Sequence, residues 1–196
     1  GYTPSTLILD APYVIDQGPG LPKWKPANYS DEFYGLTTMR TGIEKSRNLM
    51  TIRLANKIGV DTILSSAKDF KIEKYLDKNM SMSLGSGLVT LIDLTNAYGI
   101  IANGGKEIKP NIIKSIYSRN GKQILDNSNK FCNNCKLENI NINSNLPEIN
   151  KIAKEVVDPK IAYQITSMME GVIQRGTARS LKDLKTPLAG KTGTTN

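Results

Sequence analysis

The sequence predicts a chain that mixes amphipathic helices with a β-hairpin. Apolar residues recur at helical spacing within 38–58, 90–105 and 158–176, and glycine closes each of these runs. Residues 111–125 form two β-rich arms about an Asn-Gly pair, the commonest two-residue hairpin turn. Pro-, Gly- and Asn-rich stretches separate these segments and predict long loops.

Composition limits the chemistry that the chain can perform. Its 196 residues are enough for one ordinary domain or for a large piece of a bigger one. The chain has no histidine, which excludes Ser-His-Asp and Cys-His hydrolysis and His-ligated zinc or haem. Proton transfer would therefore use Lys, Asp, Glu, Tyr or a hydroxyl group.

The net charge of +8 is a weak indication of function. Lysines alternate with acidic residues over 68–78, which predicts a solvated face and not a nucleic-acid surface. A non-enzymatic basic module that binds nucleic acid or anionic surfaces stays open as an alternative, and steeply salt-dependent DNA binding would support it. No apolar run approaches the ~20 residues of a membrane span, so we expect any anchor or export signal upstream of Gly1.

The first half of the chain is predicted to pass from loop to helix. Prolines and glycines punctuate residues 1–35, which indicates an extended, loop-dominated entry. The helical pattern of 38–58 is interrupted at Ser46-Arg47-Asn48 and stops at Gly59. We expect two helical segments with a polar junction between them.

Two further helices have clear start signals. Thr90 and Asp93 form a capping box, and Asp158-Pro159 supplies an N-cap with proline in the first turn. Glycines at 104–105 and 176 end these helices. The predicted buried stripes are Leu91, Leu94, Tyr98 and Ile101 in the first helix, and Ile161, Ile165, Met168 and Val172 in the second.

Residues 126–150 are rich in Asn, Ser and Lys, which predicts a loop insertion. The two cysteines, Cys132 and Cys135, lie inside it. A metal site would need two more ligands, and no further Cys or His exists, so we expect no metal. In an oxidising compartment these cysteines would form a small-loop disulfide, although free thiols remain open.

Without histidine, acyl transfer can still use a serine activated by a lysine, as in the Ser-x-x-Lys, Ser-x-Asn and Lys-Thr-Gly motifs of penicillin-recognising enzymes. Ser-x-Asn occurs at Ser46-Arg47-Asn48 and at Ser118-Arg119-Asn120. The hairpin turn already explains the second copy, whereas the first interrupts a helix and can project polar groups into a cleft. The alternative for Ser46 is an ordinary N-cap of the second helical segment.

Ser-x-x-Lys occurs once, at Ser65-Ser66-Ala67-Lys68. A motif scan would name Ser65 as the nucleophile. The charged residues that follow predict a wet surface, whereas a lysine that serves as a base needs partial desolvation to lower its pKa. We therefore expect Ser65 not to be the nucleophile.

The segment from Leu188 to Asn196 is predicted to be a strand that carries Lys191-Thr192-Gly193-Thr194. On a strand, Thr192 and Thr194 would share one face and could bind a carboxylate. Gly193 would let a peptide backbone approach, and Lys191 would supply positive potential. The alternative is a glycine-containing strand with a surface lysine.

Taken in order and spacing, seven segments resemble the transpeptidase domain of class A penicillin-binding proteins, most closely the 1A type. The segments are 24–29 (WKPANY), 34–40 (YGLTTMR), 44–48 (EKSRN), 97–98 (AY), 102–105 (ANGG), 174–178 (QRGTA) and 189–196 (AGKTGTTN). The resemblance covers nearly the whole chain outside 126–150. It implies that residues 1–196 are the central part of one such domain.

The resemblance implies an α+β fold of the serine β-lactamase and DD-peptidase type, with an antiparallel sheet beside a helical subdomain. The family's nucleophilic Ser-x-x-Lys precedes its Ser-x-Asn, so we expect it upstream of Gly1, with the closing strands and last helix after Asn196. We expect the piece itself to be inactive and marginally stable.

By the same resemblance, Ser46 would relay a proton to the leaving amine and Asn48 would hydrogen-bond the acyl amide of the substrate. Lys191 would hold Ser46 in place, and Thr192, Gly193 and Thr194 would bind the substrate with its terminal carboxylate. No metal or organic cofactor is implied.

The implied activity is peptidoglycan cross-linking from D-Ala-D-Ala stem peptides, inhibited by β-lactams. The implied setting is a membrane-anchored protein of the bacterial inner membrane, with a periplasmic catalytic domain, a glycosyltransferase domain upstream, lipid-linked precursors as partners and a cell-wall synthesis complex. A β-lactamase or a penicilloyl sensor of the same superfamily is the alternative, and rapid drug hydrolysis would favour it.

Overall fold

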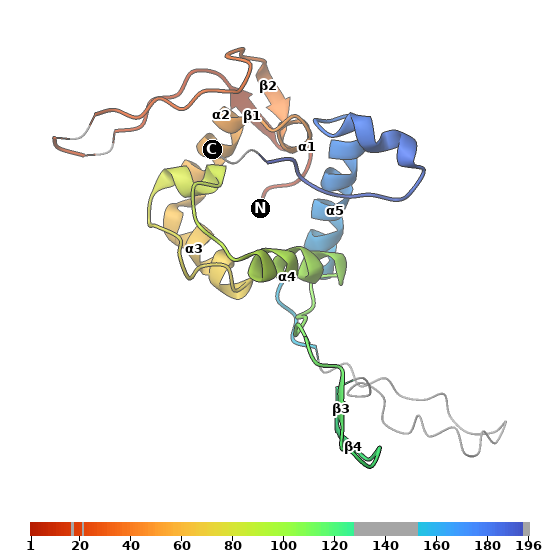
Figure 1. Ribbon diagram of the computed structural model, residues 1–196. Coiled ribbons are helices and arrows are strands. Elements are labelled where there is room, and N and C mark those ends of the chain that lie inside the picture. Colours follow the sequence, from red (N-terminus) through yellow and green to blue (C-terminus); the bar gives the residue numbers. More distant parts are fainter. Residues whose placement is uncertain (17, 21, 128–152, 194–196) are drawn as a thin grey trace.

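The computed structural model describes residues 1–16, 18–20, 22–127 and 153–193. The elements, in chain order (Figure 1), are β1 (Leu7–Asp10), β2 (Gly35–Thr38), α1 (Met39–Glu44), α2 (Asn48–Ile58), α3 (Val60–Asp69), η1 (Met80–Leu84), α4 (Leu91–Ala102), β3 (Ser115–Tyr117), β4 (Gln123–Asp126), α5 (Pro159–Gln174) and η2 (Arg179–Leu184). Within these described ranges, no helix has the length and apolar character to cross a lipid bilayer.

The N-terminal region contains a two-stranded antiparallel sheet that the sequence analysis did not predict. β1 pairs with β2 in a register that places Leu7 opposite Thr38 and Asp10 opposite Gly35. Gly35 has a φ of +67°, a conformation that glycine adopts without strain, and it lets the chain turn into β2. The strands are four residues each, so the loop-rich composition of 1–35 hid them.

The interruption predicted within 38–58 is confirmed. α1 begins after the N-cap Thr38, whose side chain accepts a hydrogen bond from the Thr41 N–H, and ends at Glu44. α2 begins at Asn48 and ends before Gly59, whose φ is +87°. The three residues between the two helices form the junction that carries Ser46.

The caps predicted for α4 are confirmed, but its predicted stripe is wrong. The Thr90 side chain accepts from the Asp93 N–H. Leu91 is 82% exposed and Leu94 and Tyr98 are also exposed, whereas Ala97 and Ile100 are buried. Because this helix is apolar on most of its faces, spacing alone could not tell which face packs against the rest of the protein.

The prediction for α5 is largely confirmed. The Asp158 side chain caps the helix, and Pro159 lies in its first turn. Met168 and Val172 are buried as predicted, whereas Ile161 is exposed. α5 lies alongside α1 (Figure 1). The end of α5 contributes to a hydrophobic cluster of three buried residues, Val172, Ile173 and Ala178. The partly buried Ile43 and Leu188 pack against it.

The predicted hairpin is confirmed as β3 and β4, which extend away from the helices (Figure 1). Gly121 has a φ of +76° in its turn, and the Ser118 hydroxyl accepts a hydrogen bond from the Lys122 N–H. The second Ser-x-Asn copy is therefore part of a turn. The predicted insertion at 126–150 lies outside the described residues from 128 onward, as do Cys132 and Cys135.

The strand predicted from Leu188 is wrong for 188–193, which form no regular element, and 194–196 lie outside the described residues. A strand exists only through hydrogen bonds to a neighbouring strand. Here the Gly190 N–H donates to the carbonyl of Met169, a helical residue, at 3.3 Å. Helix α5, and not a sheet, is the neighbour of this segment.

Candidate active site

Ser46 occupies the junction between α1 and α2 in a left-handed backbone conformation, with a φ of +55°. Such a conformation costs about 1–3 kcal/mol for a residue other than glycine and persists where the surroundings impose it. The Ser46 N–H donates to the Ile43 carbonyl at 3.2 Å, and the Arg47 N–H donates to the Gly42 carbonyl at 2.8 Å. Arg47, and not Ser46, is the N-cap of α2, so the capping alternative does not explain this serine.

A buried polar cluster holds Arg47, the last residue of the junction. Asp10 is fully buried, and its carboxylate lies 3.9 Å from the Arg47 Nε. The Arg47 guanidinium stacks on the Tyr34 ring, 3.3 Å from its centroid. Asn28 donates to the Asp10 carboxylate at 2.8 Å and accepts from the Leu49 N–H at 3.2 Å. This cluster ties the start of α2 to β1.

Asn48 is the first residue of α2, directly behind the junction. Its side-chain amide donates to the Ala27 carbonyl at 3.0 Å. That bond holds the side chain on the same side of the helix as the segment around Asn28. The amide oxygen can accept a further hydrogen bond from a ligand.

Lys191 brings an ammonium group to Ser46 from 145 residues away in the sequence. Its Nζ donates to the Ser46 hydroxyl at 2.7 Å and to the Thr192 carbonyl at 3.0 Å. Partial desolvation lowers the pKa of Lys191, although the residue as a whole remains exposed to solvent. A lysine with a lowered pKa in contact with a serine hydroxyl can exchange a proton with it.

Thr192, the residue after Lys191, makes a second hydroxyl contact. Its Oγ1 lies 2.6 Å from the Thr177 Oγ1, just beyond the end of α5. Thr192 and Gly193 are both exposed, so a ligand can reach them. Thr194 lies outside the described residues. Because 188–193 form no strand, the shared face predicted for the two threonines is not seen.

Ser65 and Lys68 lie on α3, both exposed. The hydrogen bonds of Lys191 go to Ser46 and Thr192, not to this serine. Lysines and acidic residues of 68–78 are largely exposed, as predicted for a solvated face. Within the described ranges, no three His, Cys, Asp or Glu side chains gather as metal ligands would.

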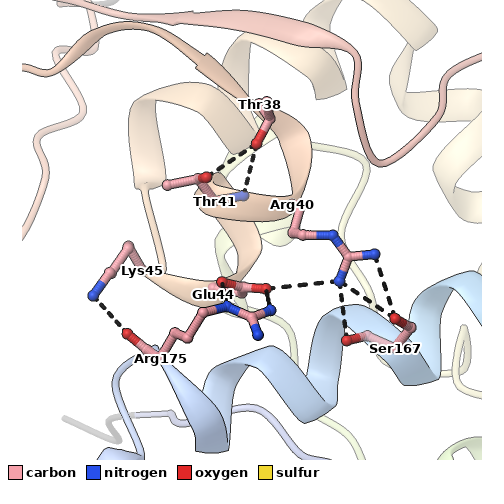
Figure 2. A network of polar contacts seen from close by, with 7 residues as sticks. All are labelled: Thr38, Arg40, Thr41, Glu44, Lys45, Ser167 and Arg175. Atoms are coloured by element: carbon pink, nitrogen blue, oxygen red, sulfur yellow. Dashed lines mark hydrogen bonds and ion pairs between the residues drawn. The ribbon is translucent and has the colours of Figure 1, made fainter.

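The sequence did not reveal an ion pair beside the site, between a buried carboxylate and a largely exposed guanidinium, although the segments that carry the two residues were noted. Glu44 at the end of α1 is only 5% exposed, and its carboxylate accepts from the Arg175 Nη2 at 2.5 Å and Nε at 3.2 Å (Figure 2). This carboxylate raises the pKa of Arg175. Arg40 approaches the same carboxylate at 3.7 Å and donates to Ser167 on α5. No local signal links residues 131 apart in sequence.

Comparison with known sequences matches this chain to one family. The family profile described as penicillin binding protein transpeptidase domain matches residues 2–196. Penicillin-binding protein 1A of Rickettsia bellii is 46% identical over 197 residues, and that of Pseudomonas aeruginosa is 30% identical over 227. Both alignments cover 100% of this chain but only 25% and 28% of the relatives. The chain therefore spans about a quarter of the length of these relatives.

Solved structures share the fold. Penicillin-binding protein 1A from Haemophilus influenzae matches with a TM-score of 0.83 at 24% identity, over 100% of this chain and 32% of that one. The D,D-transpeptidase domain of a peptidoglycan glycosyltransferase from Eggerthella lenta matches with a TM-score of 0.70 at 18% identity, over 100% of this chain and 49% of that one. These matches confirm the predicted α+β fold of penicillin-binding transpeptidase domains, of which the chain forms a part.

Proposed function

Because the chain belongs to the family of penicillin-binding protein transpeptidase domains, we propose that it is the central part of a serine DD-transpeptidase that cross-links peptidoglycan. The observation that supports this most directly is the 2.7 Å hydrogen bond between the Lys191 ammonium and the Ser46 hydroxyl. It joins two of the three motifs that serine-lysine acyl transfer requires.

The proposed reaction has two acyl-transfer steps. A serine from a Ser-x-x-Lys motif earlier in the natural protein attacks the D-Ala-D-Ala carbonyl, loses its proton to a base and forms an ester. The peptide bond breaks, and the departing D-alanine amine takes up a proton. The amine of a neighbouring stem peptide then attacks the ester, forms the cross-link and returns the serine hydroxyl. A β-lactam acylates the same serine and stops at the ester.

Each motif residue has a proposed role in this scheme. Ser46 relays the proton to the leaving amine, and Lys191 orients Ser46 and makes the site electropositive. Asn48 hydrogen-bonds the acyl amide of the substrate. The exposure of Thr192 and Gly193 supports binding of the substrate backbone and its carboxylate there, together with Thr194. The exposure of Ser65 and its place after Ser46 in the chain argue against it as the nucleophile.

The proposed setting follows from the relatives, of whose length this chain covers about a quarter. The name of the Eggerthella lenta match supports a glycosyltransferase domain in the same natural protein. We therefore propose a membrane-anchored synthase of the bacterial inner membrane with this domain in the periplasm, acting on stem peptides and lipid-linked precursors within a cell-wall synthesis complex. No metal or organic cofactor takes part in the proposed steps.

Labelling of the complete natural protein with a fluorescent penicillin, followed by digestion and mass spectrometry, tests the proposal. We expect the penicilloyl group on a serine upstream of Gly1 and a loss of at least about 100-fold in labelling rate for Lys191→Ala, since proton-transfer groups contribute factors of that order. Lys160→Ala, which removes an exposed lysine at the start of α5, is the matched control and keeps the parent rate.

Three outcomes would contradict the proposal. Label on Ser65 would show that the motif order has been misread. A folded protein that takes no label would favour a non-catalytic binding module. Rapid release of hydrolysed drug would favour a β-lactamase. Residues 1–196 expressed alone should take no label, because their one Ser-x-x-Lys is the exposed Ser65 motif.

A further inference from the structure

The end of α1 and the end of α5 meet around one buried carboxylate. Glu44 lies two residues before Ser46, and Arg175 follows the last residue of α5. Two nitrogens of the Arg175 guanidinium bind the two carboxylate oxygens of Glu44, the paired geometry that fixes both side chains most firmly (Figure 2). The carboxylate is buried, while the Arg175 side chain remains 58% exposed.

Three further hydrogen bonds tie the same two chain ends together and extend the link. The Thr177 N–H donates to the Glu44 carbonyl at 3.1 Å. The Lys45 ammonium donates to the Arg175 carbonyl at 2.7 Å, as Figure 2 shows. The Thr177 hydroxyl then meets the Thr192 hydroxyl at 2.6 Å. The chain next to Ser46 is thus joined to the chain next to Lys191.

Two glycines leave the space that this contact occupies. A Cβ at Gly171 would overlap the Glu44 Oε1, and a Cβ at Gly176 would overlap the Glu44 carbonyl oxygen. A side chain at Gly176 would push the backbone at the end of α1 away from α5, and one at Gly171 would displace the Glu44 carboxylate. The close approach of the two helix ends therefore depends on these residues as well as on the ion pair.

We propose that Glu44 and Arg175 are positioning residues of the acyl-transfer site, which set the distance between Ser46 and the Lys191-Thr192 segment. This inference rests on the proposed function. The contacts form a closed circuit from Ser46 through Glu44, Arg175, Thr177, Thr192 and Lys191 back to Ser46. Displacement of a reacting group by about 1 Å can cost about 100-fold in rate, so a circuit that fixes this distance acts on catalysis.

An ion pair that buries one of its charges is weak evidence for stability, because the loss of hydration of that charge offsets the attraction. The buried Glu44 carboxylate loses hydration in this way close to the site. Arg40 lies 3.7 Å from the same Glu44 carboxylate and donates hydrogen bonds to Ser167 on α5. They provide a natural comparison, since they share the helix interface but not the circuit.

The test measures the second-order rate constant of acylation by a fluorescent penicillin, its pH profile and the melting temperature in the complete natural protein. We expect Glu44→Gln and Arg175→Lys to lower the acylation rate constant by about 10- to 100-fold. We also expect them to move the pH profile, because the distance between Lys191 and Ser46 changes. Ser167→Ala is the matched control and alters at most the melting temperature.

Folded Glu44→Gln and Arg175→Lys variants with parental rates and pH profiles would overturn the inference, and so would an equal loss of rate in Ser167→Ala. If Glu44→Gln does not fold, Arg175→Lys decides, because the exposed Arg175 side chain tolerates the change. A parent that takes no label overturns the proposed function together with this inference. A labelled parent with unaffected variants overturns the inference alone.

Discussion

The two segments that meet at the candidate site are held in different ways. The junction between α1 and α2, which carries Ser46, is flanked by two buried charged groups, Asp10 at 0% and Glu44 at 5% exposure. The segment of Lys191 to Gly193 is exposed and forms no regular element, and the Lys191 and Thr192 side chains hold it through hydrogen bonds with hydroxyl and carbonyl oxygens. The Ser46 junction is therefore anchored by buried groups, whereas the Lys191 segment is held by exposed hydrogen bonds.

This difference predicts how substitutions will behave. A change beneath the Ser46 junction alters packing and buried charge, so it should appear first in the free energy of unfolding. A change in the Lys191 segment removes exposed contacts, so it should appear in activity with little effect on stability. Substitutions in the two segments that change stability and activity in the same proportion would contradict this comparison.

The largest effect is expected for Asp10→Ala. The substitution removes a fully buried carboxylate and with it one contact each of Arg47 and Asn28, and breaking a buried charge pair typically costs about 3–5 kcal/mol. Urea denaturation of the parent and the variant measures the difference in the free energy of unfolding.

The matched control for this prediction is Asp61→Ala. Asp61 also pairs with a cation, Lys78, but both side chains are largely exposed, so the expected loss is at most about 1 kcal/mol. Similar losses for Asp10→Ala and Asp61→Ala would show that the Ser46 junction is no better anchored than the protein surface.

A smaller effect, and one on activity, is expected for Thr177→Val. The change removes the 2.6 Å contact with the Thr192 hydroxyl but keeps the backbone bond to Glu44. One hydrogen bond contributes about 0.5–1.5 kcal/mol, which corresponds to a loss of about 2- to 10-fold in the penicillin acylation rate of the complete natural protein.

Thr186→Val removes a hydroxyl of the exposed loop after η2 and serves as the control. Its acylation rate should equal that of the parent. A melting temperature that falls in Thr177→Val without any change in rate would mean that the Thr177 contact stabilises the loop but does not place Thr192 for ligand binding.

The sequence predicted those parts of the fold that depend on neighbours along the chain. The capping residues Thr90 and Asp158, the hairpin turn at Gly121 and the break at Ser46 all act within a few residues, and all were found. The strand at Leu188 was wrong because a strand is defined by its pairing partner, which local pattern does not reveal. The stripe of α4 was wrong because several of its faces are apolar.

The residues of the site also differ in whether local sequence predicts them. The motif residues Ser46, Asn48 and Lys191 were selected by short spacings and by resemblance to a family. The ion pair of Glu44 and Arg175 joins residues 131 apart, and neither residue type is unusual where it stands. Long-range pairs of this kind become visible only when packing brings two helix ends together.

The smallest effect is expected in the pH dependence of stability. Partial desolvation lowers the pKa of Lys191 from its ordinary value of 10.5, so the folded protein releases this proton at a lower pH than the unfolded chain does. Between the two pKa values the unfolded state binds more protons, and the free energy of unfolding rises with pH. Below the lowered pKa both states carry the charge, and the desolvation penalty is fully present.

Lys191→Gln removes this contribution and isolates it. The pKa of the exposed Lys74 is raised by Tyr75 and acts in the opposite sense, but it is common to both proteins and cancels in their difference. The stability of the parent relative to Lys191→Gln should therefore increase as the pH approaches 10.5, as measured by urea midpoints at matched pH. A flat difference would mean that the ammonium is as well hydrated at the site as in the unfolded chain. Lys191 would then act on Ser46 through its charge and its hydrogen bond alone, without a pKa matched to proton transfer.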